Sequence, residues 1–127
     1  MTTLEEIKKK YSELGELIAV LEKESTIYAT SNNWRVLFFE IAISTYGISM
    51  NDLKQKNRSE TIVMVRQIFM FLLRQNDRLY YAEIGRMLQK DHSTVMWGVN
   101  KSIEYIQVND YRFMRVYDNF KHLNFGK

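Results

Sequence analysis

The sequence predicts an all-α protein: a helical bundle that contains a helix-turn-helix and is preceded by an amphipathic, coiled-coil-like helix. Three observations support this class. None of the 127 residues is proline, so no ring interrupts a helix interior. Apolar residues recur at helical spacing along most of the chain. Two helical segments near residues 82–106 are separated by a very short turn, which is typical of a helix-turn-helix.

Residues 1–30 are predicted to form one amphipathic helix, separate from a second unit at residues 33–125. Its apolar residues alternate spacings of three and four, as in a coiled coil: Leu4, Ile7, Tyr11, Leu14, Ile18 and Leu21. Residues 1–33 carry four Lys and six Glu, whereas the remainder carries fourteen Lys or Arg and nine Asp or Glu. The basic excess of the remainder is compatible with a polyanionic partner. We expect residues 4–21 either to form a homodimer or bind a protein partner, or to fold back onto the bundle.

Residues 33–46 are apolar on nearly all sides, which predicts a buried helix. Gly47 suits the turn at its C-terminal end. Ser49 is expected to cap a short helix from Met50 to about Lys56. The connection that follows is basic and carries Lys54, Lys56 and Arg58. Such a connection is either a solvated surface or a segment that reaches phosphates or a groove.

A longer helix is predicted from Ser59 or Glu60 to about Asn76. We expect four of its apolar residues to face the core: Ile68, Phe69, Leu72 and Leu73. Gln67 and Arg74 are seven residues apart and therefore share a stripe on this helix. Asn76-Asp77 is the signal for the turn that ends it.

Residues 82–88 and 91–106 are predicted to form a helix-turn-helix whose turn is Gln89-Lys90, with Asp91 as the cap of the second helix. The inner face of the second helix is expected to contain Val95, Val99, Ile103 and Ile106. Its outer face is expected to contain Ser93, Trp97, Lys101 and Glu104. The N-terminal side chains of a recognition helix reach base edges in the major groove, and the helix N-terminus favours a phosphate.

Residues 110–124 are predicted to form one last amphipathic helix that packs onto the bundle. Its packing face is expected to contain Tyr111, Met114, Tyr117 or Val116, and Phe120. Residues three or four apart lie on the same side of a helix, which is why these positions are grouped.

The sequence gives no indication of an enzyme, a metal centre or a cofactor site. It lacks Cys, and its two histidines, His92 and His122, are far apart in the chain, so no metal site is expected. No motif pairs a nucleophile with a base, and the phosphate-binding pattern G-x-x-x-x-G-K-[ST] is absent. No apolar run is long enough to cross a membrane, and the first residues lack the apolar core of a signal peptide. We therefore expect a cytoplasmic protein that binds neither membrane nor nucleotide.

Two motifs flank the predicted turn: Ala82-Glu83-Ile84-Gly85 and Asp91-His92-Ser93-Thr94-Val95. They are similar to the proline-glutamate-isoleucine-glycine stretch and the aspartate-histidine-threonine-threonine-valine signature of the C-terminal DNA-binding domain of the bacterial replication initiator DnaA. Arg66-Gln67 matches the arginine-glutamine pair of that family, and residues 48–53 resemble the short helix before its basic loop. The resemblance covers roughly residues 40–107.

The resemblance implies sequence-specific binding of double-stranded DNA at a short box that contains A·T pairs. It implies that helix 91–106 enters the major groove, while Arg58 of the basic loop enters the adjacent minor groove. Gln67 and Arg74 match positions that contact the DNA backbone. The candidate DNA-contacting residues are Arg58, Gln67, Arg74, Lys90, Asp91, His92, Ser93, Thr94 and Lys101.

The sequence departs from the family pattern near the turn. Gln89-Lys90 replaces glycine-glycine-arginine and is one residue shorter, which predicts a tighter turn and a different tilt of the signature helix. Glu60 stands where the family often has another loop arginine, so it adds repulsion near phosphate. Ala82 and Trp97 replace a proline and a histidine.

The chain has no ATP-binding loop and only 127 residues, so we expect a DNA-binding module without the ATPase domain of the initiator. Replication control, transcriptional regulation, and a phage or mobile-element role all fit such a module. The alternative is a protein-interaction module that binds replication machinery through the heptads of residues 4–21.

Overall fold

The computed structural model describes residues 29–56 and 59–126, and within these ranges there are helices and connections but no strand. The helices are α2 (Trp34–Tyr46), α3 (Met50–Lys54), α4 (Glu60–Asp77), α5 (Tyr81–Leu88), α6 (His92–Gln107), α7 (Tyr111–Tyr117) and a 3₁₀ turn, η1 (Lys121–Leu123). The predicted all-α class is confirmed. The predicted heptad segment, residues 4–21, and the predicted minor-groove residue, Arg58, lie outside the described residues.

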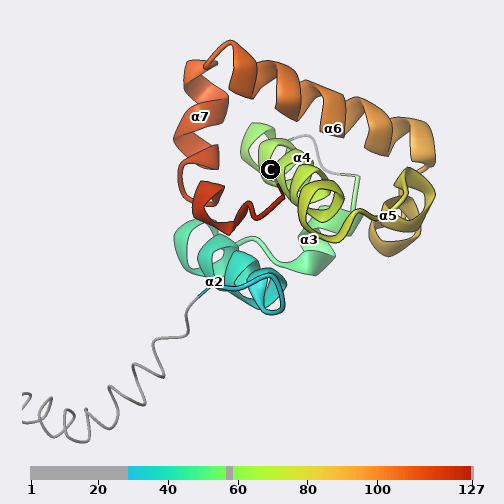
Figure 1. The fold of residues 1–127 in the computed structure, drawn as a ribbon, viewed down its shortest axis with the longest axis horizontal. Coiled ribbons are helices and arrows are strands. Elements are labelled where there is room, and N and C mark those ends of the chain that lie inside the picture. Colours follow the sequence, from blue (N-terminus) through green and yellow to red (C-terminus); the bar gives the residue numbers. More distant parts are fainter. Residues whose placement is uncertain (1–28, 57–58, 127) are drawn as a thin grey trace, which may run out of the picture.

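Helix α4 forms the centre of the bundle. Figure 1 shows α4 nearly end-on, with α6 on one side and α2 on the opposite side. Residues 65–73, nine in succession, are buried, because α4 packs against α3, α5, α6 and α7 and its aromatic residues also meet those of α2. The four residues predicted to face the core are all buried, which confirms that prediction: Ile68, Phe69, Leu72 and Leu73.

Helix α2 has the predicted bounds but not the predicted burial. Only Trp34, Phe38 and Ala42 are buried, and they lie four residues apart on one side of the helix. On the other side, Val36 is 59% exposed and Ile43 is 54% exposed. The prediction of a fully buried helix was therefore wrong, because within the described residues the bundle covers only one face of α2.

The buried face of α2 joins the core through closely packed aromatic rings. The centroid of the Phe38 ring lies 4.8 Å from that of Phe69 in α4 and 4.4 Å from that of Phe120 near the C-terminus. Aromatic pairs at such separations add stabilisation beyond the area that they bury. Three distant segments of the chain are thus held together by one cluster.

The connection from α2 to α3 follows the predicted local signals. Gly47 adopts a left-handed conformation (φ 69°) that ends α2, which confirms its predicted role. Ser49 caps α3: its backbone N–H donates to the Asp52 carboxylate at 2.8 Å, and its hydroxyl accepts from the Asp52 N–H at 3.4 Å. Helix α3 ends at Lys54, two residues before the predicted end, because Gln55 is already extended (φ −83°, ψ 165°).

The C-terminal region is not the single helix that was predicted for residues 110–124. Helix α7 ends at Tyr117 and is followed by a turn and by η1. Asp110 caps α7 by accepting from the Phe113 N–H at 3.0 Å. The packing face then falls on Phe113, Val116, Tyr117 and Phe120, all buried, while Tyr111 is 74% exposed. The prediction was right for residues 116, 117 and 120 and wrong for Tyr111, because the inward stripe begins two residues later.

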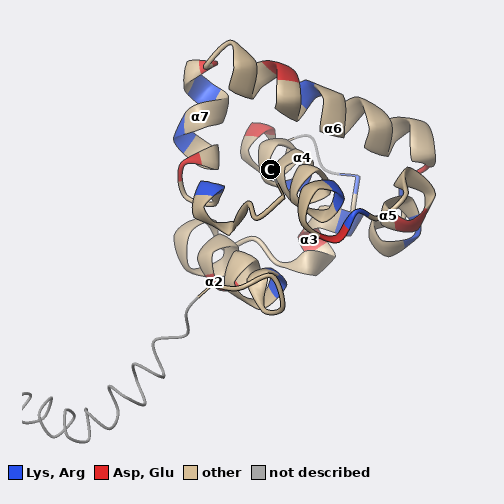
Figure 2. Cartoon of the chain, in the orientation of Figure 1, with Lys and Arg blue, Asp and Glu red and all other residues tan. Residues whose placement is uncertain are grey.

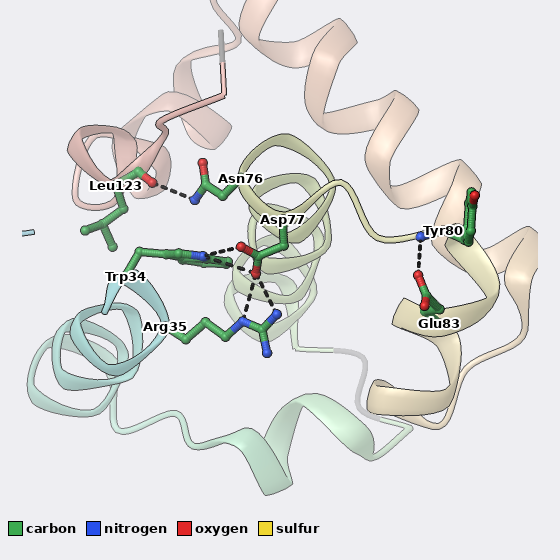
Figure 3. A network of polar contacts seen from close by, with 7 residues as sticks. All are labelled: Trp34, Arg35, Asn76, Asp77, Tyr80, Glu83 and Leu123. Atoms are coloured by element: carbon green, nitrogen blue, oxygen red, sulfur yellow. Dashed lines mark hydrogen bonds and ion pairs between the residues drawn. The ribbon is translucent and has the colours of Figure 1, made fainter. Parts of the chain in front are cut away.

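The turn that was predicted at Asn76-Asp77 is not found there. Both residues belong to the last turn of α4, and the helix ends at Arg78, which has a left-handed conformation (φ 54°). Figure 3 shows what their side chains do instead. The Asn76 amide donates to the carbonyl of Leu123 at 2.8 Å. Both carboxylate oxygens of Asp77 lie 3.3 Å from Nε1 of the buried Trp34, and one accepts from Nε of Arg35 at 3.0 Å.

This network predicts that Asp77 anchors α2 to α4. Asp77→Ala leaves the buried indole N–H of Trp34 without its acceptor, and an unsatisfied buried donor costs about 1–3 kcal/mol. We expect the free energy of unfolding, from urea denaturation followed by circular dichroism, to fall by roughly that amount. Asp118→Ala is the control, since it removes only an exposed ion pair with Lys121. Equal losses for the two variants would contradict the anchoring role.

Candidate nucleic-acid interface

Helices α5 and α6 form the predicted helix-turn-helix. Gln89 ends α5 in a left-handed conformation (φ 58°), and the Lys90 N–H donates back to the Gly85 carbonyl at 2.9 Å. Apolar side chains from both helices pack in the core beneath the turn: Ile84, Leu88 and Val95 are fully buried. The tight Gln89-Lys90 turn is as predicted, and it forms without a glycine in the turn itself.

Gly85 is needed because the turn passes directly over α5. A Cβ atom at this position would collide with the carbonyl oxygen of Lys90. That oxygen belongs to the backbone, so it can move only if the whole turn moves. Gly85 therefore sets how closely the start of α6 approaches α5.

The first turn of α6 presents polar side chains to solvent. Asp91 caps the helix by accepting from the Thr94 N–H at 2.9 Å, as predicted. This hydrogen bond holds the pKa of the Asp91 carboxyl below its ordinary value, so the cap is ionised at neutral pH. Asp91, His92, Ser93 and Thr94 are all exposed, whereas the next residue, Val95, is fully buried. The exposed turn is thus held in place by the buried Val95 that directly follows it.

The inner face of α6 differs from the prediction at one position. Val95 and Val99 are buried and Ile106 is half-buried, but Ile103 is 36% exposed. Its place is taken by Ser102, whose hydroxyl lies 3.0 Å from the Gly98 carbonyl and 3.1 Å from that of Gln67 in α4. The two helices come so close at Gly98 that a Cβ there would lie 2.8 Å from the sulfur of Met70. Small residues at 98 and 102 let α6 lie close to α4. The face of α6 that meets α4 therefore contains Ser102 and not Ile103.

The N-terminal half of α6 carries no Lys, Arg, Asp or Glu, as Figure 2 shows. The first charged residue is Lys101, which forms an ion pair with Glu104 at 3.3 Å. Its ammonium lies 5.7 Å from the ring centroid of Trp97, a side chain that is 57% exposed. Hydroxyl and imidazole groups at one end and a cation farther along the same helix suit base contacts and phosphate contacts, respectively.

The two predicted backbone-contacting residues of α4 are placed differently from each other. Gln67 is only 6% exposed, and its side chain lies under α6 beside Gly98. Arg74 is half-buried: its Nη1 donates to the Leu79 carbonyl at 2.9 Å, and its guanidinium lies 4.6 Å from the ring centroid of Tyr81. Both residues border the helix-turn-helix, and Arg74 keeps further N–H donors for another partner.

Two features near the site had no counterpart in the sequence-based prediction. Arg66 is buried (8% exposed) and donates to carbonyls at the end of α3, and the Lys90 ammonium reaches the same place. Arg112 of α7 pairs with Glu60 at 2.7 Å, which offsets the negative charge expected to repel phosphate. The sequence signal for the buried Arg66 was its place inside the otherwise uncharged run of residues 61–73.

In the described ranges, no three His, Asp or Glu side chains cluster as metal ligands would.

The close approach at Gly85 predicts that Gly85→Ala destabilises the fold. The collision with backbone should cost about 1–3 kcal/mol, which outweighs the gain of about 1 kcal/mol from replacing glycine by alanine in a helix. Gly98→Ala is the matched control: the atom in its way belongs to the flexible Met70 side chain, which can move aside, and alanine keeps a small residue at the contact between α4 and α6. Urea denaturation should show a loss for Gly85→Ala only, and equal effects would refute the argument.

The Asp91 cap predicts a pH-dependent contribution to stability. Because the folded-state pKa of Asp91 lies below the unfolded value of about 3.9, ionisation favours folding. The contribution is present above about pH 4 and is lost as the pH falls through the folded-state pKa. The stability difference between wild type and Asp91→Ala should therefore shrink between about pH 6 and about pH 2.5 in urea titrations. A constant difference would contradict this role.

Comparison with known proteins identifies the family of this segment. A profile of the family described as "Bacterial dnaA protein helix-turn-helix" matches residues 39–101. The chain is also similar to proteins named "Chromosomal replication initiator protein DnaA". Identity is 37% over 73 residues with that of Chloroflexus aggregans, which covers 57% of this chain and 15% of the relative. With that of Herpetosiphon aurantiacus it is 35% over 100 residues, which covers 72% of this chain and 21% of the relative.

The chain therefore spans about a fifth or less of the length of these relatives. No solved structure gives a significant match to it. The matched residues run from within α2 to the middle of α6 and include the whole turn between α5 and α6. The resemblance seen in the two motifs is confirmed: residues 39–101 match the helix-turn-helix of the bacterial DnaA family.

Proposed function

We propose that this protein binds double-stranded DNA sequence-specifically, at a site similar to a DnaA box, and that it does not act as an enzyme. The observation that carries the proposal is the exposed polar turn Asp91–Thr94 at the start of α6. It lies on a helix-turn-helix whose family members are named as chromosomal replication initiators. In such motifs the N-terminal side chains of the second helix reach the base edges of the major groove.

In this proposal, the contacts divide between bases and backbone. His92, Ser93 and Thr94 supply donors and acceptors to base edges, while Asp91 caps the helix and can accept from a cytosine amino group. Arg74 and Lys101 supply phosphate contacts that fix the register, and Gln67 supports α6 from below. Sequence recognition then depends on the polar turn at the start of α6, and the salt dependence of binding depends on the flanking cations.

Arg58 is the proposed minor-groove residue. It lies in the basic connection between α3 and α4 on the sequence. A narrow A·T-rich minor groove attracts an arginine through its enhanced negative potential. A contact there would add discrimination at base pairs that α6 does not reach.

The proposed biological role is accessory: replication control or a related regulatory function. The relatives' name supports a link to replication. The absence of the ATP-binding pattern G-x-x-x-x-G-K-[ST] from these 127 residues supports a role for this segment that needs no bound nucleotide.

The proposal predicts that base contacts and phosphate contacts can be separated by mutation. His92→Ala should lower the discrimination between a duplex with a DnaA-type box and a scrambled duplex by about 1–3 kcal/mol. Arg74→Ala should weaken both complexes similarly and reduce the slope of log K against log salt by about 0.9. Fluorescence anisotropy over a range of salt concentrations measures both effects.

Lys121→Ala provides the control, because Lys121 is an exposed cation on η1, beside α2 and away from α5. It should change neither discrimination nor salt slope. Equal binding of the wild type to both duplexes, or no binding at moderate salt, would rule out recognition of a DnaA-type box. Selection of bound duplexes from a random pool would show whether the protein prefers another sequence.

A further inference from the structure

Three backbone carbonyl groups at the end of α3 face two cations from other parts of the fold. Arg66 donates from Nε to the carbonyl of Leu53 at 2.8 Å and from Nη2 to that of Gln55 at 2.9 Å. Lys90 donates from Nζ to the carbonyls of Lys54 at 2.9 Å and Gln55 at 3.1 Å. These are the carbonyls that a helix leaves without partners at its C-terminal end.

Carbonyl dipoles hold the two cations. Among the described residues no carboxylate pairs with either of them, because the ion pairs there involve other residues. Burial lowers the pKa of both groups, and the charges of Arg66 and Lys56 lower the pKa of Lys90 further. Two like charges close together repel each other, so the four hydrogen bonds are what keeps them in place.

These hydrogen bonds join two segments that are distant in sequence. Lys90 directly precedes Asp91, the cap of α6, and its own N–H is fixed by the Gly85 carbonyl at 2.9 Å. Gln55 begins the connection from α3 to α4, where Lys56 is exposed. A shift of either segment would change the separation between the polar turn of α6 and Lys56.

We infer that Lys90 is a positioning residue for DNA binding: with Arg66 it holds the end of α3 at a fixed place beside the start of α6. The inference rests on the proposed function and changes the role of Lys90 from the direct DNA contact that the sequence suggested. A side chain that already makes two hydrogen bonds to α3 must break both to reach a phosphate. Groups held in fixed mutual geometry bind a matching duplex better than groups that must first be ordered.

Salt-dependent anisotropy with the box duplex and the scrambled duplex distinguishes the two roles. For Lys90→Ala we expect affinity for the box to fall roughly 2- to 30-fold, the range of mutations that alter coupling between sites. Affinity for the scrambled duplex and the salt slope should both stay at the wild-type values. Lys90→Arg should restore box affinity, because a guanidinium reaches the same carbonyls. Arg74→Ala serves as the reference for a lost phosphate contact.

The outcomes separate this inference from the proposed function. A fall in salt slope of about 0.9 for Lys90→Ala, with equal weakening of both duplexes, would make Lys90 a phosphate contact and overturn the inference alone. Unchanged binding to both duplexes would also overturn it. If Lys90→Ala does not fold in urea titrations, Lys90→Met keeps the aliphatic stem and is judged by the same criteria. A wild type that binds neither duplex would overturn the proposed function and the inference with it.

Discussion

The complete burial of the middle of α4 is the constraint on which the other parts of the structure depend. Residues 65–73 have no solvent-facing side, so every turn of this stretch must be covered by another helix. Because Arg66 lies within it, burial also forces its guanidinium to find partners inside the protein. Arg66 finds them at the end of α3, and the backbone carbonyl of Gln67 lies against the Ser102 hydroxyl of α6. The central helix thus fixes the elements around it through polar contacts as well as through apolar packing.

The candidate interface depends on this arrangement at two levels. Small residues at 98 and 102 let α6 lie close against α4, which fixes the axis of the helix. The close contact of Gly85 with the turn then fixes where α6 begins. Neither level involves the exposed residues His92, Ser93 and Thr94, which are free to differ in chemistry without affecting the support below them. A separation of this kind allows one scaffold to present different contact residues.

Local signals in the sequence were sufficient to predict the helices and their caps, but not all of the packing. Ser49, Asp91 and Gly47 predicted helix ends because capping depends on a few neighbouring residues. The exposed faces of α2 and the inner stripe of α6 were predicted less well, since an apolar residue such as Ile43 or Ile103 does not reveal which side of its helix meets a neighbour. The positions of Arg66 and Lys90 depend on contacts across more than ten residues of sequence, which a periodic pattern does not contain.

The anchoring of α2 has a consequence for what can be attached to this domain. Trp34 and Arg35 tie the beginning of α2 to the far end of α4, and Figure 1 shows α2 across α4 from α6. The described chain therefore enters the bundle on the side remote from the polar turn of α6. A fluorescent label, an affinity tag or a fused protein joined directly to residue 29 would be tethered at that remote side. Immobilisation through such a tether would leave the candidate interface open to a long duplex.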